Sequence, residues 1–174
     1  MSNFHDLAQK RHSIRKYTDE AISADDVKTI LEAALMAPSS KRSTPWEFVV
    51  IEDKEKLNAI AGCREFGTLP LTRAALAVLV CVNPETSHAW VEDGAIAATF
   101  MQLQAEDLGL GSCWIHVRER FTKDNEPSQD YIRSIVDIPE ELQILCAVVF
   151  GHKAEEKSPF DLEKLQWEKV HIVK

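Results

Sequence analysis

A helix with apolar residues around most of its circumference limits what this chain can fold into. The pattern predicts a long helix over residues 91–108, and between Ala95 and Met101 almost every side chain is apolar or small. Such a helix has no natural solvent-facing side and must be covered all round. Two arrangements satisfy this condition. Either the helix lies inside the chain's own core, or a second subunit packs on it, and Ala97 and Ala98 would permit that close approach.

The other elements predict an α+β fold in a single domain, residues 1–174. Uninterrupted apolar runs at 75–82 and 144–150 indicate buried strands, the second ending at Gly151, and shorter strands are expected at 46–51 and 112–115. Strands and helices do not alternate strictly, which favours α+β over a doubly wound sheet. We also expect helices near residues 4–10, 23–37, 57–61 and 129–136. Residues 170–173 are expected to add an edge strand.

Charge, apolar run length and cysteine spacing exclude several classes of function. A formal net charge of -8 argues against nucleic acid as a partner, because phosphate neutralisation needs a clustered basic face. The N-terminus lacks the apolar stretch of a signal peptide, and no apolar run approaches the roughly 20 residues that span a bilayer. We therefore expect a cytoplasmic protein with no membrane partner. The four cysteines are far apart and form no C-x-x-C pair, so we expect reduced thiols and no metal site.

A basic segment follows the first predicted helix and reads Arg11-His12-Ser13-Ile14-Arg15. In an extended segment alternate residues point the same way, so two guanidinium groups and a hydroxyl can converge on one anion. Taken alone, the segment is more often a solvated surface.

Two further segments have the composition of a ligand site. Residues 37–46 form a polar loop with two prolines between a helix and a strand. Residues 109–115 combine glycines, which let a flat ligand approach the backbone, with Trp114 as a possible wall. A plain connecting loop and a structural tryptophan are the alternatives. The G-x-G follows a helix and precedes a strand, the reverse of a dinucleotide-binding fingerprint.

Taken together and in this order, these segments resemble the nitroreductase family of FMN enzymes over nearly the whole chain. The matching features are R-x-S-x-R after a short helix, an A-P-S-S loop ending in P-W, Glu92-Asp93 opening the long helix, G-L-G-S-C-W-I after it, and a final I-x-x-x-V-x-x-G strand. The resemblance implies a three-layer α+β sandwich with a central mixed sheet. It also implies an intertwined homodimer with two FMN sites at the subunit interface.

The resemblance also assigns roles to residues in three groups. The first group would hold the FMN phosphate and ribityl chain and comprises Arg11, His12 and Ser13, joined by Lys153 or Lys157. The second, Ser39, Ser40 and Arg42, would reach the site from the partner subunit. The third lines the flavin ring and comprises Trp114 and Ile115, with Arg15 at the pyrimidine edge as the catalytic residue.

The function implied by the resemblance is electron transfer from NADH or NADPH through FMN to a nitroaromatic, quinone or similar small acceptor, by a ping-pong mechanism. A non-catalytic FMN-binding or redox-sensing protein is the alternative. The sequence departs from the family pattern at Lys41, Arg42 and Thr44, where many members have Gly, Asn and Gln. A positive group here would raise the flavin potential or select an anionic substrate.

Overall fold

A four-stranded sheet forms the centre of the molecule in the computed structural model, which describes residues 3–174. The strand order is β1-β2-β4-β3, and each neighbouring pair is antiparallel. The predicted buried strands are the two interior ones. The strands are β1 (Trp46–Ile51), β2 (Leu76–Val82), β3 (Leu110–His116) and β4 (Gln143–His152).

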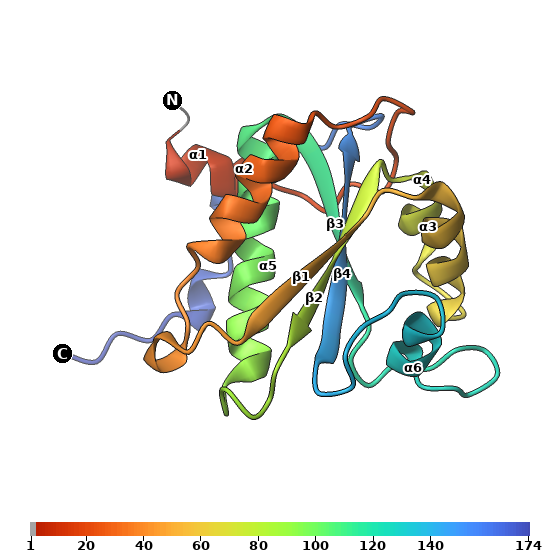
Figure 1. Cartoon of the computed structure of the whole chain (residues 1–174). Helices are drawn as coiled ribbons and strands as arrows, with labels where there is room; N and C mark the ends of the chain where they lie inside the picture. The colour runs from red at the N-terminus through yellow and green to blue at the C-terminus, as the bar shows by residue number, and fades with distance from the viewer. Residues whose placement is uncertain (1–2) are drawn as a thin grey trace.

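Helices cover both faces of this sheet, which gives the expected three layers (Figure 1). Long helices α2 and α5 lie on one face, and short helices α3, α4 and α6 lie on the other. β2 serves both cores: Val78 and Val80 pack toward α2 and α5, whereas Leu79 packs toward α3. The helices are α1 (Phe4–Lys10), α2 (Ala24–Leu35), α3 (Lys54–Ile60), α4 (Leu69–Arg73), α5 (Trp90–Asp107) and α6 (Ser128–Arg133).

Local sequence signals account for where α2 begins and how closely α5 packs. The hydroxyl of Ser23 accepts a hydrogen bond from the Asp26 N–H, as the predicted N-cap requires. In α5, a Cβ placed on Gly94 would lie 2.7 Å from Leu145 and 2.9 Å from Val82. A larger residue at this position would therefore push the helix away from the sheet.

α5 is only partly covered by its own chain. Ala97, Ala98 and Met101 are fully buried against the sheet, but Ile96 and Phe100 on the outer side remain 36% and 37% exposed. The intramolecular core therefore does not cover the helix all round. An apolar strip of α5 stays available for a further contact.

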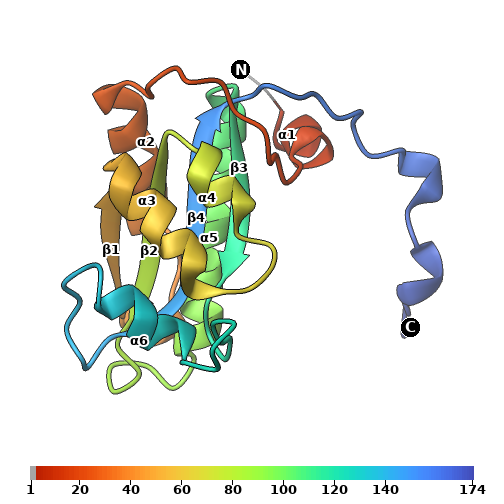
Figure 2. The ribbon, with the colours of Figure 1, turned by 90° about the vertical axis from the view of Figure 1, so that its right-hand side faces the viewer.

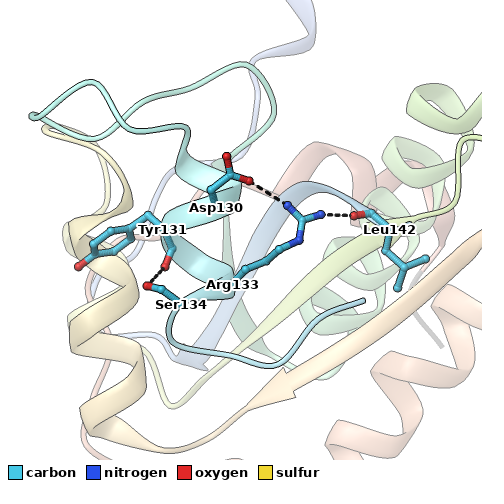
Figure 3. Close-up of polar contacts among 5 residues, drawn as sticks. All are labelled: Asp130, Tyr131, Arg133, Ser134 and Leu142. Carbon is cyan, nitrogen blue, oxygen red and sulfur yellow. Dashed lines mark hydrogen bonds and ion pairs between the residues drawn. The ribbon is translucent and has the colours of Figure 1, made fainter. Parts of the chain in front are cut away.

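α6 is fixed to the beginning of β4 by an arginine (Figure 3). Arg133 donates hydrogen bonds to the Leu142 carbonyl and, at 3.2 Å, to the Asp130 carboxylate. Ser134 donates to the Tyr131 carbonyl at 2.7 Å and closes the end of the helix. These bonds hold the short helix over the end of the sheet where β4 begins.

Three details differ from the expectations. The strands of the sheet are antiparallel rather than mixed, and the parallel pairing is confined to an isolated bridge between Ser13 and Ser112. β4 does not stop at Gly151 but continues to His152, which pairs with Leu110 of β3; the His152 carbonyl also accepts a hydrogen bond from the Thr18 N–H at 2.9 Å.

The tail is the third difference, because residues 170–173 form no strand. After β4 the chain leaves an interior strand, whose two edges are already paired, and runs away from the sheet (Figure 2). Two short 3₁₀ turns, Leu162–Lys164 and Trp167–Lys169, interrupt this extended tail. Within residues 3–174, no helix has the length and apolarity to cross a membrane.

Candidate functional site

The predicted basic segment lies across one end of the sheet. The Ile14 N–H donates to the Ser112 carbonyl at 2.9 Å, and the side chains of Ile14 and Tyr17 are buried in the core. Gly111 permits this crossing, because a Cβ there would lie 2.9 Å from Ile14. The buried anchors fix the backbone of the segment and leave Arg15 at the surface.

Two cations converge on the backbone of this segment. The Lys157 ammonium donates to the Ser13 carbonyl at 2.9 Å, and an Arg15 guanidinium nitrogen lies 3.5 Å from the same oxygen. The carboxylate of Glu155 accepts a hydrogen bond from the Arg15 N–H at 2.8 Å. Burial raises the pKa of the neighbouring Cys113 thiol, and the charges of Arg15 and Lys157 oppose that rise. Both cations therefore face the beginning of β3.

Lys153 and Lys157, which the sequence could not distinguish, have different surroundings. Lys153 forms a 2.7 Å ion pair with Glu106 of α5, whose side chain is only 10% exposed. Lys157 forms no ion pair with any of the described residues and contacts a neutral carbonyl instead. The charge of Lys157 is therefore the less compensated of the two.

Beside the segment is a cavity of about 370 Å³ that suits an anion. The His12 ring stacks on Phe160 at 4.4 Å, and its Nε2 atom is buried with no hydrogen-bond partner among residues 3–174. A buried polar atom without a partner is unfavourable unless a ligand or water satisfies it. The cavity is lined by Lys10, His12, Ile14, Glu106, Lys153, Glu156, Lys157 and Pro159. This donor set fits the phosphate of a nucleotide.

A second cavity, of about 290 Å³, lies on the other side of Lys157 and includes Arg15. Its lining is again cationic, with an apolar contribution from α4: Arg15, Lys16, Leu69, Pro70, Arg73, Glu155 and Lys157. Arg11 lines neither cavity. It follows α1 directly, and its N–H donates to the Leu7 carbonyl.

The loop with Ser39, Ser40 and Arg42 is held in a strained conformation. Lys41, Arg42 and Thr44 have φ of 52°, 58° and 43°, a region that residues other than glycine rarely adopt. The Ser39 hydroxyl accepts a hydrogen bond from the Thr44 N–H at 2.9 Å. Non-glycine residues with positive φ persist only where surrounding contacts impose them.

Asp93 supplies those contacts from the first turn of α5. Its side chain is buried, and it accepts hydrogen bonds from the Ser40 N–H and the Ser87 hydroxyl, both at 2.7 Å. The sequence pattern indicated only an acidic helix start. The structure assigns Asp93 to the support of the loop.

The structure does not bring this loop to the basic segment within one chain. The loop is tied to Asp93 at the beginning of α5, whereas the basic cavity includes Glu106 near its end. These residues are thirteen positions apart, which corresponds to about 20 Å along a helix. One chain therefore presents two halves of the predicted site at opposite ends of α5.

The residues expected to line the ring occupy edge strand β3. Trp114 is partly exposed on the α5 side, whereas the Ile115 side chain is 2% exposed and packs in the opposite core, so only its backbone is available to a ligand. The sequence interpretation missed the next residue, His116, whose Nδ1 accepts a hydrogen bond from Trp114 Nε1 at 3.3 Å. It also missed the arginines around His116, although the R-x-R that follows the strand was a visible signal.

The fold is an α+β three-layer sandwich, and one of its cavities has a lining that fits the phosphate of a nucleotide. Comparison with known proteins identifies the family. The model of the nitroreductase family matches residues 8–85 and 64–152. The chain belongs to the nitroreductase family.

Individual relatives agree with this assignment. An FMN-dependent nitroreductase from Clostridium difficile R20291 superposes with a TM-score of 0.94 at 42% identity, over 98% of this chain and 99% of that one. A nitroreductase with bound FMN from Bacteroides fragilis has a TM-score of 0.79 at 26% identity and full coverage of both chains. A protein of Archaeoglobus fulgidus named "Putative NADH dehydrogenase/NAD(P)H nitroreductase" is 34% identical over 157 residues, 88% of this chain and 87% of its own length.

Proposed function

We propose that this chain is an FMN-dependent oxidoreductase that takes electrons from NADH or NADPH and passes them to a nitroaromatic, quinone or similar small acceptor in a ping-pong cycle. The observation that carries the proposal is the cavity at the end of the sheet, where the unpartnered His12 Nε2 and the Lys157 ammonium, which forms no ion pair among the described residues, can both bind an anion. The relatives named as NAD(P)H nitroreductases and the FMN-bound neighbour support the identity of that ligand.

In this proposal the phosphate end of FMN is held by His12 and Lys157, with Ser13 beside them and Arg11 approaching from the end of α1. Lys153 is already paired with Glu106 and contributes less net charge. Charge-assisted hydrogen bonds of this kind are about twice as strong as neutral ones. Bound FMN would supply the redox chemistry, and the protein supplies orientation and charge.

Arg15 is the residue to which we assign a catalytic role. Its guanidinium group lies outside the proposed phosphate cavity and lines the neighbouring one, so in this proposal it would offer a positive charge to the pyrimidine edge of bound FMN. A unit charge about 4 Å away is worth about 4 kcal/mol at an effective dielectric constant near 20. Solvent reduces this figure because the Arg15 side chain is exposed, but Arg15 would still favour negative charge on a bound flavin.

The proposal requires a homodimer, because one chain presents the two halves of the site about 20 Å apart. Ser39, Ser40 and Arg42 would then complete the site of the neighbouring subunit. Exposed apolar groups of α5 and of the tail support such an interface: Ile96 and Phe100, and Trp167, Ile172 and Val173, which are 67%, 78% and 95% exposed. A second copy of the chain packed on these side chains would cover the outer side of α5, which the first chain leaves exposed.

Anaerobic spectroscopy tests the proposed activity. NADH or NADPH is expected to bleach the flavin absorbance of the protein, and a quinone added afterwards is expected to restore it. A protein that binds FMN but is not bleached would support the redox-sensing alternative instead. A protein that fails to take up FMN would contradict both.

Variants of the basic segment separate the two proposed roles. Arg11→Ala is expected to weaken FMN binding by roughly ten- to a hundredfold, the loss of about 1.5–3 kcal/mol, and to leave riboflavin binding unchanged. Arg15→Ala is expected to lower the flavin midpoint potential in FMN-saturated protein. The control is Lys28→Ala, which removes an exposed charge on α2. Identical behaviour of the two arginine variants would contradict the assignment.

A further inference from the structure

Three arginines surround His116 at the end of β3, and we call Arg64, Arg118 and Arg120 the arginine cluster. Arg64 donates to the His116 carbonyl at 3.3 Å. The Arg118 guanidinium lies 5.6 Å from the centre of the Trp90 ring, and Arg120 donates to the Glu119 carbonyl at 3.3 Å. Arg64 thus reaches the end of β3 from a separate part of the chain, and Arg118 and Arg120 follow the strand directly, in a protein of net charge -8.

The turn that presents this cluster is tightly held. Two consecutive N–H groups, those of Val117 and Arg118, donate to the Leu145 carbonyl, and the Arg120 N–H donates to the Val117 carbonyl at 3.1 Å. Glu119 between the two arginines has a φ of 54°, a left-handed conformation that is uncommon for glutamate. The backbone therefore fixes Arg118 and Arg120 on either side of a strained residue, as functional turns often do.

The charges of the cluster are incompletely compensated. Glu119 forms a 2.5 Å ion pair with Arg118, but Arg64 and Arg120 donate to neutral carbonyls. Burial lowers the pKa of His116, and Arg120, Arg64 and Arg118 lower it further, opposed by Glu119. The imidazole of His116 therefore stays neutral at pH 7.

The neutral imidazole of His116 also supplies one hydrogen-bond donor beside the arginine cluster. Because Nδ1 accepts the Trp114 N–H at 3.3 Å, the ring proton resides on Nε2. The two rings are nearly parallel, with centroids 6.2 Å apart and an interplanar angle of 17°. Trp114 and His116 thus form a flat aromatic surface with the arginine cluster at its edge.

We propose that this surface selects an electron acceptor that is planar and anionic, carrying a carboxylate or a sulfonate. The inference rests on the proposed function, in which Trp114 lines the flavin ring, so that an acceptor beside the ring reaches the cluster. Guanidinium groups bind such oxyanions through paired hydrogen bonds. On a protein of negative net charge, a local positive patch also draws anions to this position.

Matched acceptors test the proposal in FMN-saturated protein. The specificity constant for para-nitrobenzoate is divided by that for the neutral para-nitrobenzyl alcohol, so that general effects on turnover cancel. Arg120→Gln and Arg118→Gln are each expected to lower this ratio about three- to tenfold, the range for a partly exposed charge contact. The control is Lys56→Gln, which removes one exposed positive charge from α3 and is expected to leave the ratio unchanged.

Binding without turnover gives a second measurement. Benzoate is expected to quench the tryptophan fluorescence of the wild-type protein at lower concentration than benzyl alcohol does, and Arg120→Gln is expected to reduce that difference about three- to tenfold. Arg120 is exposed, and its side chain donates one hydrogen bond, to the neighbouring Glu119 carbonyl, so this variant is expected to keep the fold even where loss of Arg118 from Trp90 disturbs it. Higher ionic strength is expected to weaken benzoate binding selectively.

The outcomes separate this inference from the proposed function. A ratio unchanged in both arginine variants, or lowered equally by Lys56→Gln, overturns the anionic selectivity while leaving an active flavoenzyme. Wild-type protein that takes up no FMN overturns the proposed function, and the benzoate titration then still decides whether the cluster binds oxyanions.

Discussion

The buried carboxylate of Asp93 gives the clearest measurable consequence of the structure. Asp93 is 2% exposed and accepts hydrogen bonds at 2.7 Å from the Ser40 N–H and the Ser87 hydroxyl. Asp93→Ala would leave both donors without their acceptor and release the loop at its point of attachment to α5. We expect this change to destabilise the protein and to free the strained residues Lys41 and Arg42.

The magnitude follows from these two bonds. Each hydrogen bond to a charged group contributes about 1.5–3 kcal/mol, and removal of a buried carboxylate returns part of that cost. We therefore expect the free energy of unfolding to fall by about 2–4 kcal/mol. For a chain of this length, 1 kcal/mol corresponds to a Tm change of about 2–4 °C, so Tm is expected to fall by about 4–16 °C.

Urea unfolding monitored by circular dichroism measures this loss, with Asp93→Asn as the matched control. The amide keeps one acceptor oxygen, so about half of the loss is expected. FMN affinity should fall in Asp93→Ala as well, at a temperature where the variant remains folded. An Asp93→Ala protein as stable as wild type, with unchanged FMN affinity, would refute the role of Asp93 in supporting the loop.

Three further predictions concern the core, the thiols and the lysines. Gly151→Ala is expected to destabilise the protein by about 1–3 kcal/mol in urea unfolding, because a Cβ there would lie 2.8 Å from Tyr17, and a stable variant would contradict this packing. Burial raises the pKa of Cys81 from 9.0 to about 12, so the native thiol should resist alkylation at pH 8.5 and react after unfolding. Because the folded state binds this proton more tightly, the free energy of unfolding should fall as pH rises above about 9, and a pH-independent value would refute this linkage. Lys157→Ala should weaken FMN binding more than Lys153→Ala does in a fluorescence titration, and the reverse order would contradict the assigned charges.

The sequence predicted most of the elements because their signals are local. The apolar run of β2, the Ser23 cap of α2 and the long pattern of α5 each identify an element from neighbouring residues, and the structure confirms all three. The relative direction of the strands was harder to predict from the sequence. It depends on how distant segments pair, and the sheet proved antiparallel where a mixed one was expected.

The site was predictable as a set of segments but not as an assembly. The positions of the basic segment and the Ser39 loop were visible in the sequence, whereas their separation along α5 depends on tertiary packing. The Glu106–Lys153 ion pair and the unpartnered His12 nitrogen likewise arise between residues far apart in the chain. The tail lacks the expected strand because it runs away from the sheet, so residues 170–173 pair with neither edge strand of their own chain.

Titration of the flavin-free dimer with FMN and with riboflavin tests the central claim most directly. The account predicts that each chain takes up one FMN, and that riboflavin, which lacks the phosphate, binds at least about tenfold more weakly. Sedimentation of the saturated protein is expected to give a dimer. Equal affinities for the two flavins, or saturation of a monomer with FMN, would contradict a cation-lined phosphate site completed by a second subunit.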